Sequence, residues 1–443
     1  MPRLSLAAPR LKRTSWLILA VAGALHLGLL IGWRWQLPLV PYFFDATVLS
    51  GGRGLDFYSI YQAGYNARHG WDIYEGDPAR VEIVVPYFTP YRYLPVVAYT
   101  LGAGLSLLPP LTAYKAWVVI VELTLLGCAA LTWRRTRDDP DLAAVLTAMW
   151  LAFTPFYLEL FMGQFSLVQG ALLLGMLLAV AAPPRTAAEP PLTAERARLL
   201  DGLWLASVLW KINTVIFAPL WLRLGRWRAV VVLGLVVAAT TVPYFLAFPA
   251  HARDLLLNNF GNRVAAHELG NLGFRQLVFE ALAALGAGAA VQQVAQWAVV
   301  GLVGGLSLWL TWRQPGAPVA ALISLWLAAF FLASPQVWEH HYVMLLPAIV
   351  VAYRARPGWV LAGLWLLLAL PTPFGFIGLQ PVIAANHDLR AFALEPAWQP
   401  LAQHAAKALP ALGLFIYWVR QVFGPNSGGA SGIIPLTRQG NSG

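Results

Sequence analysis

The chain has 443 residues, of which 59% are hydrophobic and 11% are charged, and its mean hydropathy is +0.62. Soluble domains carry about 25% charged residues, so this composition excludes a protein whose surface is mostly in water. The only cysteine, Cys128, excludes a disulfide framework and a thiolate metal site. The net charge of +10 is dispersed among loops, which indicates contact with anionic lipid headgroups or a phosphorylated substrate rather than with nucleic acid.

The N-terminal segment is basic, and about 20 apolar residues follow from Trp16. This pattern resembles a signal peptide, but no small-residue cleavage site follows it. The apolar run instead ends in Trp33-Arg34-Trp35, which is typical of an anchor at the membrane interface. We therefore expect a retained first span with a cytoplasmic N-terminus.

Apolar stretches long enough to cross a hydrocarbon core of about 30 Å recur along the whole chain. They predict an all-α polytopic membrane protein of about twelve transmembrane helices, at residues 15–35, 93–109, 113–133, 142–160, 165–182, 201–222, 228–247, 296–313, 317–334, 341–353, 357–377 and 405–422. Twelve spans would return the C-terminus to the cytoplasm, and the Gly/Ser-rich tail at 423–443 is predicted to be disordered.

The distribution of cations only partly agrees with this topology. The positive-inside rule supports the N-terminus, the basic loop at 223–228 and the pair Arg354/Arg356, but the basic residues at 134–137 fall on the outer face. The stretch 274–290 is short and rich in alanine and glycine, so we predict an interfacial or re-entrant helix there. If it crossed the membrane, every later segment would be inverted.

Three segments, 36–92, 249–275 and 380–404, are too long and polar to be simple connectors. With twelve spans they all fall on the outer face, together with Glu339-His340-His341. The candidate chemistry is therefore predicted to lie on one side of the membrane.

The first outer loop carries a carboxylate next to regularly spaced tyrosines. Asp56 is followed by Tyr58, Tyr61 and Tyr65, which lie on one face of a predicted helix on the membrane surface. Asp56 could be the N-cap of that helix, or a catalytic carboxylate with tyrosines that stack on sugar rings. Spacing alone leaves both roles open, and they need not exclude each other.

Lys211 lies within an otherwise apolar span, where an unpaired charge costs at least ~2.5 kcal/mol. It needs a carboxylate, the carbonyl groups of a broken helix or a lipid phosphate as its partner. Gln164, beside Gly163, and Asn271, near Gln276, could bind sugar hydroxyls, and hydrogen bonds between packed helices explain them equally well.

Other cations near the predicted outer interface are Arg92, Arg263 and Arg275, which could bind phosphate or snorkel to the interface. The residues of the His340-His341 pair alone allow an interfacial anchor next to Trp338 or, with Glu339, a zinc site. Adjacent helical positions point about 100° apart, so a two-histidine metal clamp is disfavoured and no metal is predicted.

Several short motifs along the chain resemble one family of membrane enzymes. They are Asp56-Phe57-Tyr58, Tyr61-Gln-Ala63, Gly70, Tyr74, Tyr93-Leu-Pro95, Gly163-Gln164, Lys211 and Ser334-Pro335-Gln-Val-Trp338-Glu-His340-His341. Their order and placement resemble the GT-C-type integral membrane glycosyltransferases, and most closely glycosyltransferase family 87, the bacterial polyprenyl-phosphate-mannose-dependent mannosyltransferases.

The resemblance implies a GT-C-like bundle that moves a hexose, with mannose expected, from a polyprenyl-phosphate donor to a glycolipid or glycan hydroxyl on the outer face. It implies that Asp56 is the general base, without a cofactor, and that the anomeric configuration inverts. The residues expected at the donor phosphate are His341, His340, Arg92, Lys211 and Arg275, and the expected sugar or acceptor contacts are Tyr58, Tyr61, Gln164 and Asn271.

The resemblance also suggests a division of the chain at residue 250. Residues 1–250 are expected to form the catalytic transmembrane module, and 251–422 an outer loop with C-terminal helices. The segment 262–271 resembles the family only loosely, which leaves the acceptor open. The other acidic residues of the first loop, Asp72, Glu75 and Asp77, are predicted turn residues, which argues against a two-carboxylate or metal-dependent variant.

Two other classes of protein compete with this interpretation. A transporter or flippase of lipid-linked sugars commonly has twelve spans, and Lys211 would suit it, but no internal repeat is present. A non-catalytic membrane scaffold would leave the tyrosine-rich loop and the histidine pair unexplained.

Overall fold

The computed structural model describes residues 12–35, 37, 52–181, 192–253, 255–256, 269–373, 376–377, 381–383, 389–391 and 398–423. Arg263 and the predicted disordered tail beyond residue 423 lie outside them. The described elements, in chain order, are α1 (Arg13–Trp35), α4 (Leu55–Arg68), α5 (Pro95–Val97), η1 (Ala98–Gly102), α6 (Ala103–Leu105), α7 (Pro110–Thr136), α8 (Pro140–Leu151), α9 (Pro155–Met162), α10 (Ser166–Val180), α11 (Ala194–Trp210), η2 (Ile212–Phe217), α12 (Ala218–Arg223), α13 (Trp227–Ala247), η3 (Pro249–His251), α15 (Phe274–Ala284), α16 (Ala289–Arg313), α17 (Val319–Ala333), η4 (Glu339–Met344), α18 (Leu346–Ala355), α19 (Trp359–Ala369), β1 (Pro381–Ile383), β2 (Leu389–Ala391) and α20 (Trp398–Phe423). The strands β1 and β2 pair antiparallel, with Pro381 opposite Ala391.

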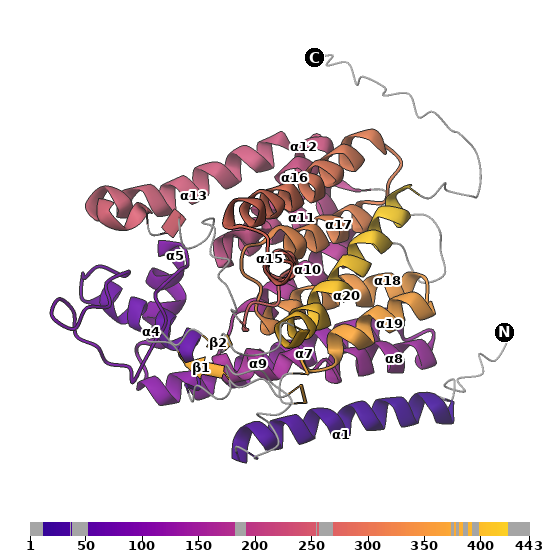
Figure 1. Cartoon of the computed structure of the whole chain (residues 1–443), viewed down its shortest axis with the longest axis horizontal. Helices are drawn as coiled ribbons and strands as arrows, with labels where there is room; N and C mark the ends of the chain where they lie inside the picture. Colours follow the sequence, from indigo (N-terminus) through magenta and orange to yellow (C-terminus); the bar gives the residue numbers. More distant parts are fainter. Residues whose placement is uncertain are drawn as a thin grey trace, which may run out of the picture.

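Most long helices follow one axis of a bundle (Figure 1). The helices α4 and α5 project at one end, which we call the loop end. The start of α1 and the end of α20 lie at the other, which we call the terminal end. Consistent with this arrangement, Phe423 at the end of α20 packs against Trp309 near the end of α16, with ring centroids 5.3 Å apart.

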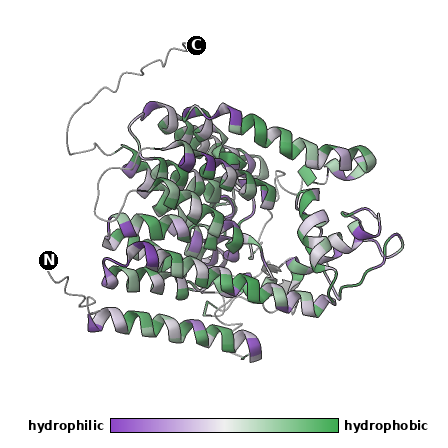
Figure 2. Ribbon diagram, turned by 180° about the vertical axis from the view of Figure 1, so that it is seen from behind, coloured by the Kyte–Doolittle hydropathy of each residue, from purple (hydrophilic) through white to green (hydrophobic). Residues whose placement is uncertain are grey.

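The helices have the composition that a membrane requires. The helices α1, α7, α13 and α16 are each long and apolar enough to cross, and α8 with α9 passes the same test as one span bent by 46°. Large apolar side chains such as Leu17 and Leu235 are exposed along α1 and α13 (Figure 2). The predicted class, a helical multi-pass membrane protein, is confirmed, whereas helix lengths do not establish the count of twelve spans.

Proline and short polar side chains begin several of these helices. Pro110, Pro140 and Pro155 occupy the first helical positions of α7, α8 and α9, where a missing N–H costs nothing. The carboxylate of Asp139 accepts a hydrogen bond from the Leu142 N–H at 3.2 Å and caps α8. These local signals divide the long apolar sequence into separate helices.

The prediction that the basic residues at 134–137 lie on the opposite side from the N-terminus is wrong. The Lys12 N–H donates to Asp141 at 2.8 Å, and the Lys12 ammonium lies 3.6 Å from the same carboxylate. The start of α1 therefore lies beside the start of α8, and the basic end of α7 lies there too. Arg354, in the last turn of α18, is within electrostatic range of Arg135. The cations gather at the terminal end.

The error arose at 93–109, which folds back instead of crossing. Three short pieces, α5, η1 and α6, pack on α4, where a Cβ atom added to Gly64 would lie 1.9 Å from the carbonyl carbon of Gly102. The Tyr61 hydroxyl donates to the Leu108 carbonyl at 2.7 Å, and Arg68 donates to the Ser106 carbonyl at 2.7 Å. The segment thus begins and ends at the loop end.

A second error offsets the first. The predicted span 201–222 is a helical hairpin, because α11 ends at Trp210 and the chain reverses through η2 and α12. The Trp221 indole donates to Asp201 at 2.9 Å, and Arg226 donates to the same carboxylate at 2.7 Å. One predicted crossing is lost and another turns back on itself, so α13 still starts at the terminal end.

Two of the three long polar segments, 36–92 and 249–275, meet as predicted. His251, after α13, lies 2.7 Å from the carboxylate of Asp72 in the first loop, so the loops near 72 and 251 share the loop end. The helix α15 has 11 residues, about 16 Å of rise, which is too short to cross. This supports the predicted interfacial or re-entrant helix in 274–290.

Candidate functional site

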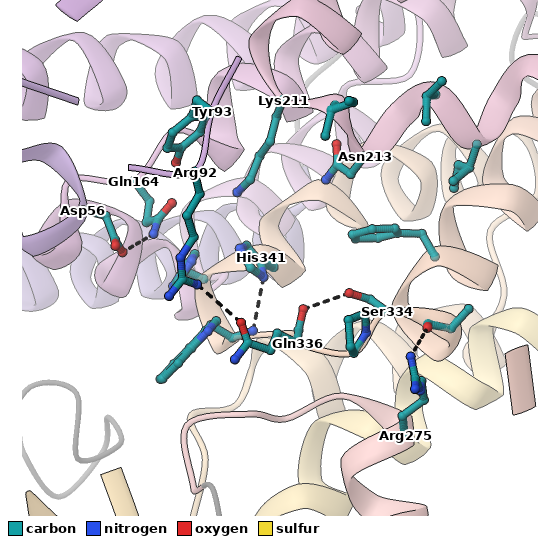
Figure 3. Close-up of a pocket in the computed structure, with 18 of the residues that line it drawn as sticks. Asp56, Arg92, Tyr93, Gln164, Lys211, Asn213, Arg275, Ser334, Gln336 and His341 are labelled. Atoms are coloured by element: carbon teal, nitrogen blue, oxygen red, sulfur yellow. Dashed lines mark hydrogen bonds between the residues drawn. The ribbon is translucent and has the colours of Figure 1, made fainter. Parts of the chain in front are cut away.

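A cavity of about 540 Å³ lies at the loop end, between α4, α15, α16, α17 and the segments around residues 92, 164, 211 and 338. It is lined by residues on both sides of the predicted module boundary at 250. Seven of the predicted site residues line it: Asp56, Arg92, Gln164, Lys211, Arg275, His340 and His341. Figure 3 shows the side chains of several of them directed toward the same space.

Asp56 lies in the first turn of α4, but it does not cap the helix. The N-cap is Gly54, and no side chain caps this end. The Asp56 carboxylate accepts hydrogen bonds from the Thr89 hydroxyl, at 2.9 Å, and from the Gln164 amide. The helix-cap interpretation of Asp56 is therefore wrong, because its oxygens face two side chains of the cavity wall instead of backbone N–H groups.

Two glycines in the left-handed conformation allow this meeting. Gly54 has φ 76° and donates its N–H to the Phe161 carbonyl at 2.8 Å. Gly163 has φ 64°, and a Cβ atom there would lie 2.5 Å from the Cβ of Phe57. Any other residue would be strained at these two positions, and a side chain at 163 would also push α4 away from the link between α9 and α10. The glycines thus bring Gln164 within reach of Asp56.

The surroundings of Asp56 act on its pKa in opposite directions. Burial in the cavity wall raises the pKa above the usual value for an aspartate. The hydrogen bond from Thr89, the charges of Arg92 and Lys211, and the hydrogen bond from Gln164 act to lower it, and the net shift is upward. A fixed carboxylate with a raised pKa is suited to accept a proton from a hydroxyl group.

Lys211 lies where α11 ends, in extended backbone with φ −154° and ψ 115°. The helix is therefore broken at Lys211, as one of the alternatives for this residue required, but no backbone carbonyl among the described residues bonds its ammonium. Its ammonium donates to the Ser166 hydroxyl at 3.1 Å. Arg92 reaches the cavity from the segment before α5, and its guanidinium donates to Gln336 at 3.4 Å (Figure 3).

The sequence analysis missed a second carboxylate next to this group. Glu159, in α9, is fully buried, and one of its oxygens accepts the N–H of Leu167 at 2.6 Å, in the first turn of α10. The preceding residue, Ser166, receives the Lys211 hydrogen bond. The sequence did contain a signal for Glu159, because an acidic residue inside the apolar stretch 142–160 is costly in a membrane and needs a reason. Thr89 was also missed, because nothing in its local sequence connects it with Asp56.

The two histidines form one edge of the cavity. Their ring centroids are 4.3 Å apart, and Nδ1 of His341 accepts the N–H of Trp338 at 3.2 Å. Glu339, between them and Trp338, does not line the cavity; its carboxylate lies 3.0 Å from the Lys407 ammonium. Among the described residues, no group of three or more His, Cys, Asp or Glu side chains could hold a metal ion.

Arg275 lines a part of the cavity away from Asp56 (Figure 3). Its guanidinium lies over the Trp297 ring, 5.2 Å from the centroid, and donates to the Ala333 carbonyl and to Gln296, each at 3.3 Å. It is 3% exposed, so it does not snorkel to water.

Three predicted sugar contacts lie outside the cavity lining. Tyr58 is 4% exposed and packs against Tyr87, with centroids 5.7 Å apart, and Tyr61 bonds the carbonyl of Leu108. Because α4 is buried on most sides, these tyrosines pack within the protein, and this packing does not support the prediction that they stack on a sugar.

Asn271 is the third of these residues, and it is fully buried. Its amide donates to the Pro335 carbonyl at 2.8 Å and to Gln276 at 3.3 Å, and its oxygen accepts the Val337 N–H at 3.0 Å. Its hydrogen-bonding groups are therefore used to join two segments. Of the two roles considered for Asn271, these bonds favour the packing role over a sugar contact.

The fold and cavity define a multi-pass helical membrane protein with a buried polar site, in which one carboxylate faces several cations. Residues 92–335, more than half of the chain, match the model of glycosyltransferase family 87. The chain therefore belongs to that family and is a membrane glycosyltransferase, as its motifs predicted.

Two similar proteins carry more specific names. The chain is 28% identical, over 390 residues, to the polyprenol-phosphate-mannose-dependent alpha-(1-2)-phosphatidylinositol mannoside mannosyltransferase of Mycolicibacterium smegmatis, covering 82% of this chain and 81% of that protein. The crystal structure of ArnT from Cupriavidus metallidurans bound to undecaprenyl phosphate is similar with a TM-score of 0.39 and 16% identity, covering 93% of this chain and 78% of ArnT.

Proposed function

We propose that this protein transfers mannose from a polyprenyl-phosphate donor to a hydroxyl group of a glycolipid or glycan. The observation that carries the proposal is the cavity in which Asp56, held by Thr89 and Gln164, faces Lys211 and His341. The name of the mycolicibacterial relative supports the choice of mannose and of a polyprenol-phosphate carrier.

In the proposed reaction Asp56 is the general base. Its carboxylate takes the proton of the acceptor hydroxyl, whose oxygen attacks the anomeric carbon. The bond from that carbon to the phosphate oxygen breaks, and the lipid phosphate leaves with the electron pair. Attack opposite the leaving group inverts the anomeric configuration. Lipid phosphate leaves without a general acid, so the site needs only cations for the developing charge.

The cations of the cavity are suited to that charge. These cations, Lys211 and Arg92, approach from the side of Asp56, and the imidazole rings of His340 and His341, which could contact the phosphate by hydrogen bonds, border the same space. We assign the donor phosphate to this group, with Arg275 farther along the cavity. Gln164 acts primarily on Asp56, so we assign it to orienting the base rather than to binding the sugar.

The apolar wall of the cavity supports a lipid-linked donor. Beyond the charged group, α16 and α17 supply aliphatic and aromatic side chains, namely Val300, Val303, Trp326, Ala329 and Phe330. Such a wall suits isoprene units next to a phosphate, whereas a soluble nucleotide sugar would leave it unused. The position of Lys211 favours an enzyme over the transporter alternative, because Lys211 lines the same cavity as Asp56 at one end of the bundle.

The clustering of cations supports a cytoplasmic terminal end. Lys12, Arg135, Arg226 and Arg354 belong to segments that meet there, as the positive-inside rule expects of a cytoplasmic face. The cavity at the loop end would then open on the outer side, and both termini would be cytoplasmic.

Substituting Asp56→Asn tests the proposal, because the amide keeps the shape of the side chain but cannot accept the proton. We expect transfer of radiolabelled mannose in proteoliposomes to fall by a factor of about 10² to 10⁴. Binding of polyprenyl phosphate, measured as a thermal shift in detergent, should change little. Asp77→Asn is the matched control, because Asp77 caps an exposed turn of the same loop, at the Ala79 N–H. Transfer by Asp56→Asn at a rate close to that of the wild type would refute the base assignment.

A further inference from the structure

A fully buried ion pair lies directly behind the histidine pair. The ammonium of Lys407, in α20, is 3.0 Å from the carboxylate of Glu339, and both side chains have an exposed fraction of 0%. Neither residue lines the cavity. The reaction proposed above does not use this pair, and the sequence analysis gave neither residue a part in the reaction.

The pair joins three helices. Lys407 also donates to the carbonyls of Leu368, at 2.7 Å, and Leu370, where α19 ends and its last carbonyls have no partner within the helix. The other oxygen of Glu339 accepts the Thr372 hydroxyl at 3.2 Å. One ammonium and one carboxylate thus connect α20, the end of α19 and the start of η4.

Glu339 is the first residue of η4, and its neighbours face the other way. Trp338, His340 and His341 line the cavity, whereas Glu339 points into the protein. In a 3₁₀-helix successive side chains are about 120° apart, so the direction in which Glu339 is held sets the directions of the next two residues. Nε2 of His340 has no hydrogen-bond partner among the described residues. Since no hydrogen bond at this atom holds the ring, its direction depends on the position of η4.

Stability alone does not account for such a pair. Replacing a buried ion pair with apolar groups of similar volume is often neutral or stabilising, because removing two charges from water costs as much as their attraction returns. The pair therefore calls for a role beyond holding the fold. We propose that the Glu339–Lys407 pair is a positioning device, which fixes η4 so that His340 and His341 present their rings to the phosphate of the donor. The identity of that ligand rests on the proposed function.

The experiment compares single and double variants. Lys407→Met alone leaves Glu339 buried without its partner and should unfold or aggregate in detergent. The double variant Glu339→Gln/Lys407→Met restores neutrality, and we expect its melting temperature to return close to that of the wild type. Its KM for polyprenyl-phosphate-mannose should rise about tenfold or more with kcat nearly unchanged, because binding of the phosphate is weakened.

A matched control is available at the terminal end. The Asp201–Arg226 pair is far from the cavity, and Asp201→Asn/Arg226→Met should leave the donor KM unchanged. A folded Glu339→Gln/Lys407→Met variant with the donor KM of the wild type would show that the pair is structural only and would overturn the proposal.

Two further measurements cover the other outcomes. If the double variant does not fold, Thr372→Val removes one hydrogen bond from Glu339 and keeps the ion pair. A two- to threefold rise in the donor KM is expected, and no rise would overturn the inference.

If the wild-type protein does not use polyprenyl-phosphate-mannose, the proposed function fails. The thermal shift caused by polyprenyl phosphate alone still tests the pair: its loss in the double or Thr372 variant supports positioning, and its retention overturns it.

Discussion

Replacing Thr89 with valine removes one hydroxyl group and keeps the shape of the side chain. In the wild-type protein that hydroxyl donates to Oδ1 of Asp56 at 2.9 Å, and this hydrogen bond lowers the pKa of Asp56 against the effect of burial. The donor stabilises the ionised carboxylate, so its removal raises the pKa of Asp56 further. Because a general base must be ionised to act, the acid limb of kcat/KM must move to higher pH.

The size of this shift follows from the strength of the bond. A hydrogen bond to a charged group contributes about 1.5 to 3 kcal/mol, and one pKa unit corresponds to about 1.4 kcal/mol. Asp56 keeps the Gln164 hydrogen bond and the charges of Arg92 and Lys211, which continue to stabilise its ionised form. We therefore expect a shift near the lower limit, about one pH unit.

The assay is the pH dependence of kcat/KM for mannose transfer in proteoliposomes buffered equally on both sides. Thr124→Val is the matched control, because the Thr124 hydroxyl bonds only within α7, to the Ile120 carbonyl at 2.8 Å, and is exposed. Its profile should superimpose on that of the wild type. An acid limb of Thr89→Val that stays in place, or moves to lower pH, would show that the limb does not report the ionisation of Asp56.

Two further predictions concern the packing that positions α4. Gly64→Ala should lower the stability in a thermal unfolding assay by about 1 to 3 kcal/mol or more, because the new methyl group meets backbone at 1.9 Å; Gly104→Ala, with no atom within 4 Å of its added Cβ, should be neutral or slightly stabilising. Tyr61→Phe should cost about 1 kcal/mol of stability, through loss of its hydrogen bond to the Leu108 carbonyl, and leave the donor and acceptor KM values unchanged. A raised KM in a folded Tyr61→Phe variant would restore the tyrosine to the site.

The parts of the site that could be predicted are those whose residue types are costly in a membrane. Lys211 and the histidine pair are conspicuous in apolar surroundings, and their polar chemistry requires a shared site or partners. Short motifs connected them with Asp56 across more than 280 residues of sequence, and the cavity brings them together. Glu159 meets the same criterion within the predicted span 142–160, and its charge could have been recognised there as that of Lys211 was.

The parts that could not be predicted depend on which face of a helix meets which neighbour. The spacing of Tyr58 and Tyr61 correctly indicated a helix, but a helical period does not say what covers the tyrosine face. In α4 that face packs on Tyr87 and the chain near Leu108, while the cavity receives Asp56. Composition describes a helix surface, whereas tertiary contacts decide its partner.

The two errors in topology have a common physical origin, and both lie at the site. Hydropathy treats any apolar stretch of sufficient length as a crossing, but 93–109 folds back on α4 and the hairpin of α11 and α12 reverses at Lys211. The first departure places Arg92 at the mouth of the cavity, and the second places Lys211 in its wall. A plain span at 201–222 would have left Lys211 inside a continuous helix instead of at the break where its ammonium meets Ser166. Departures from regular structure are expected where function demands them. In the sequence, the cations at 134–137, which the predicted topology placed on the outer face, were the signal that one predicted span did not cross.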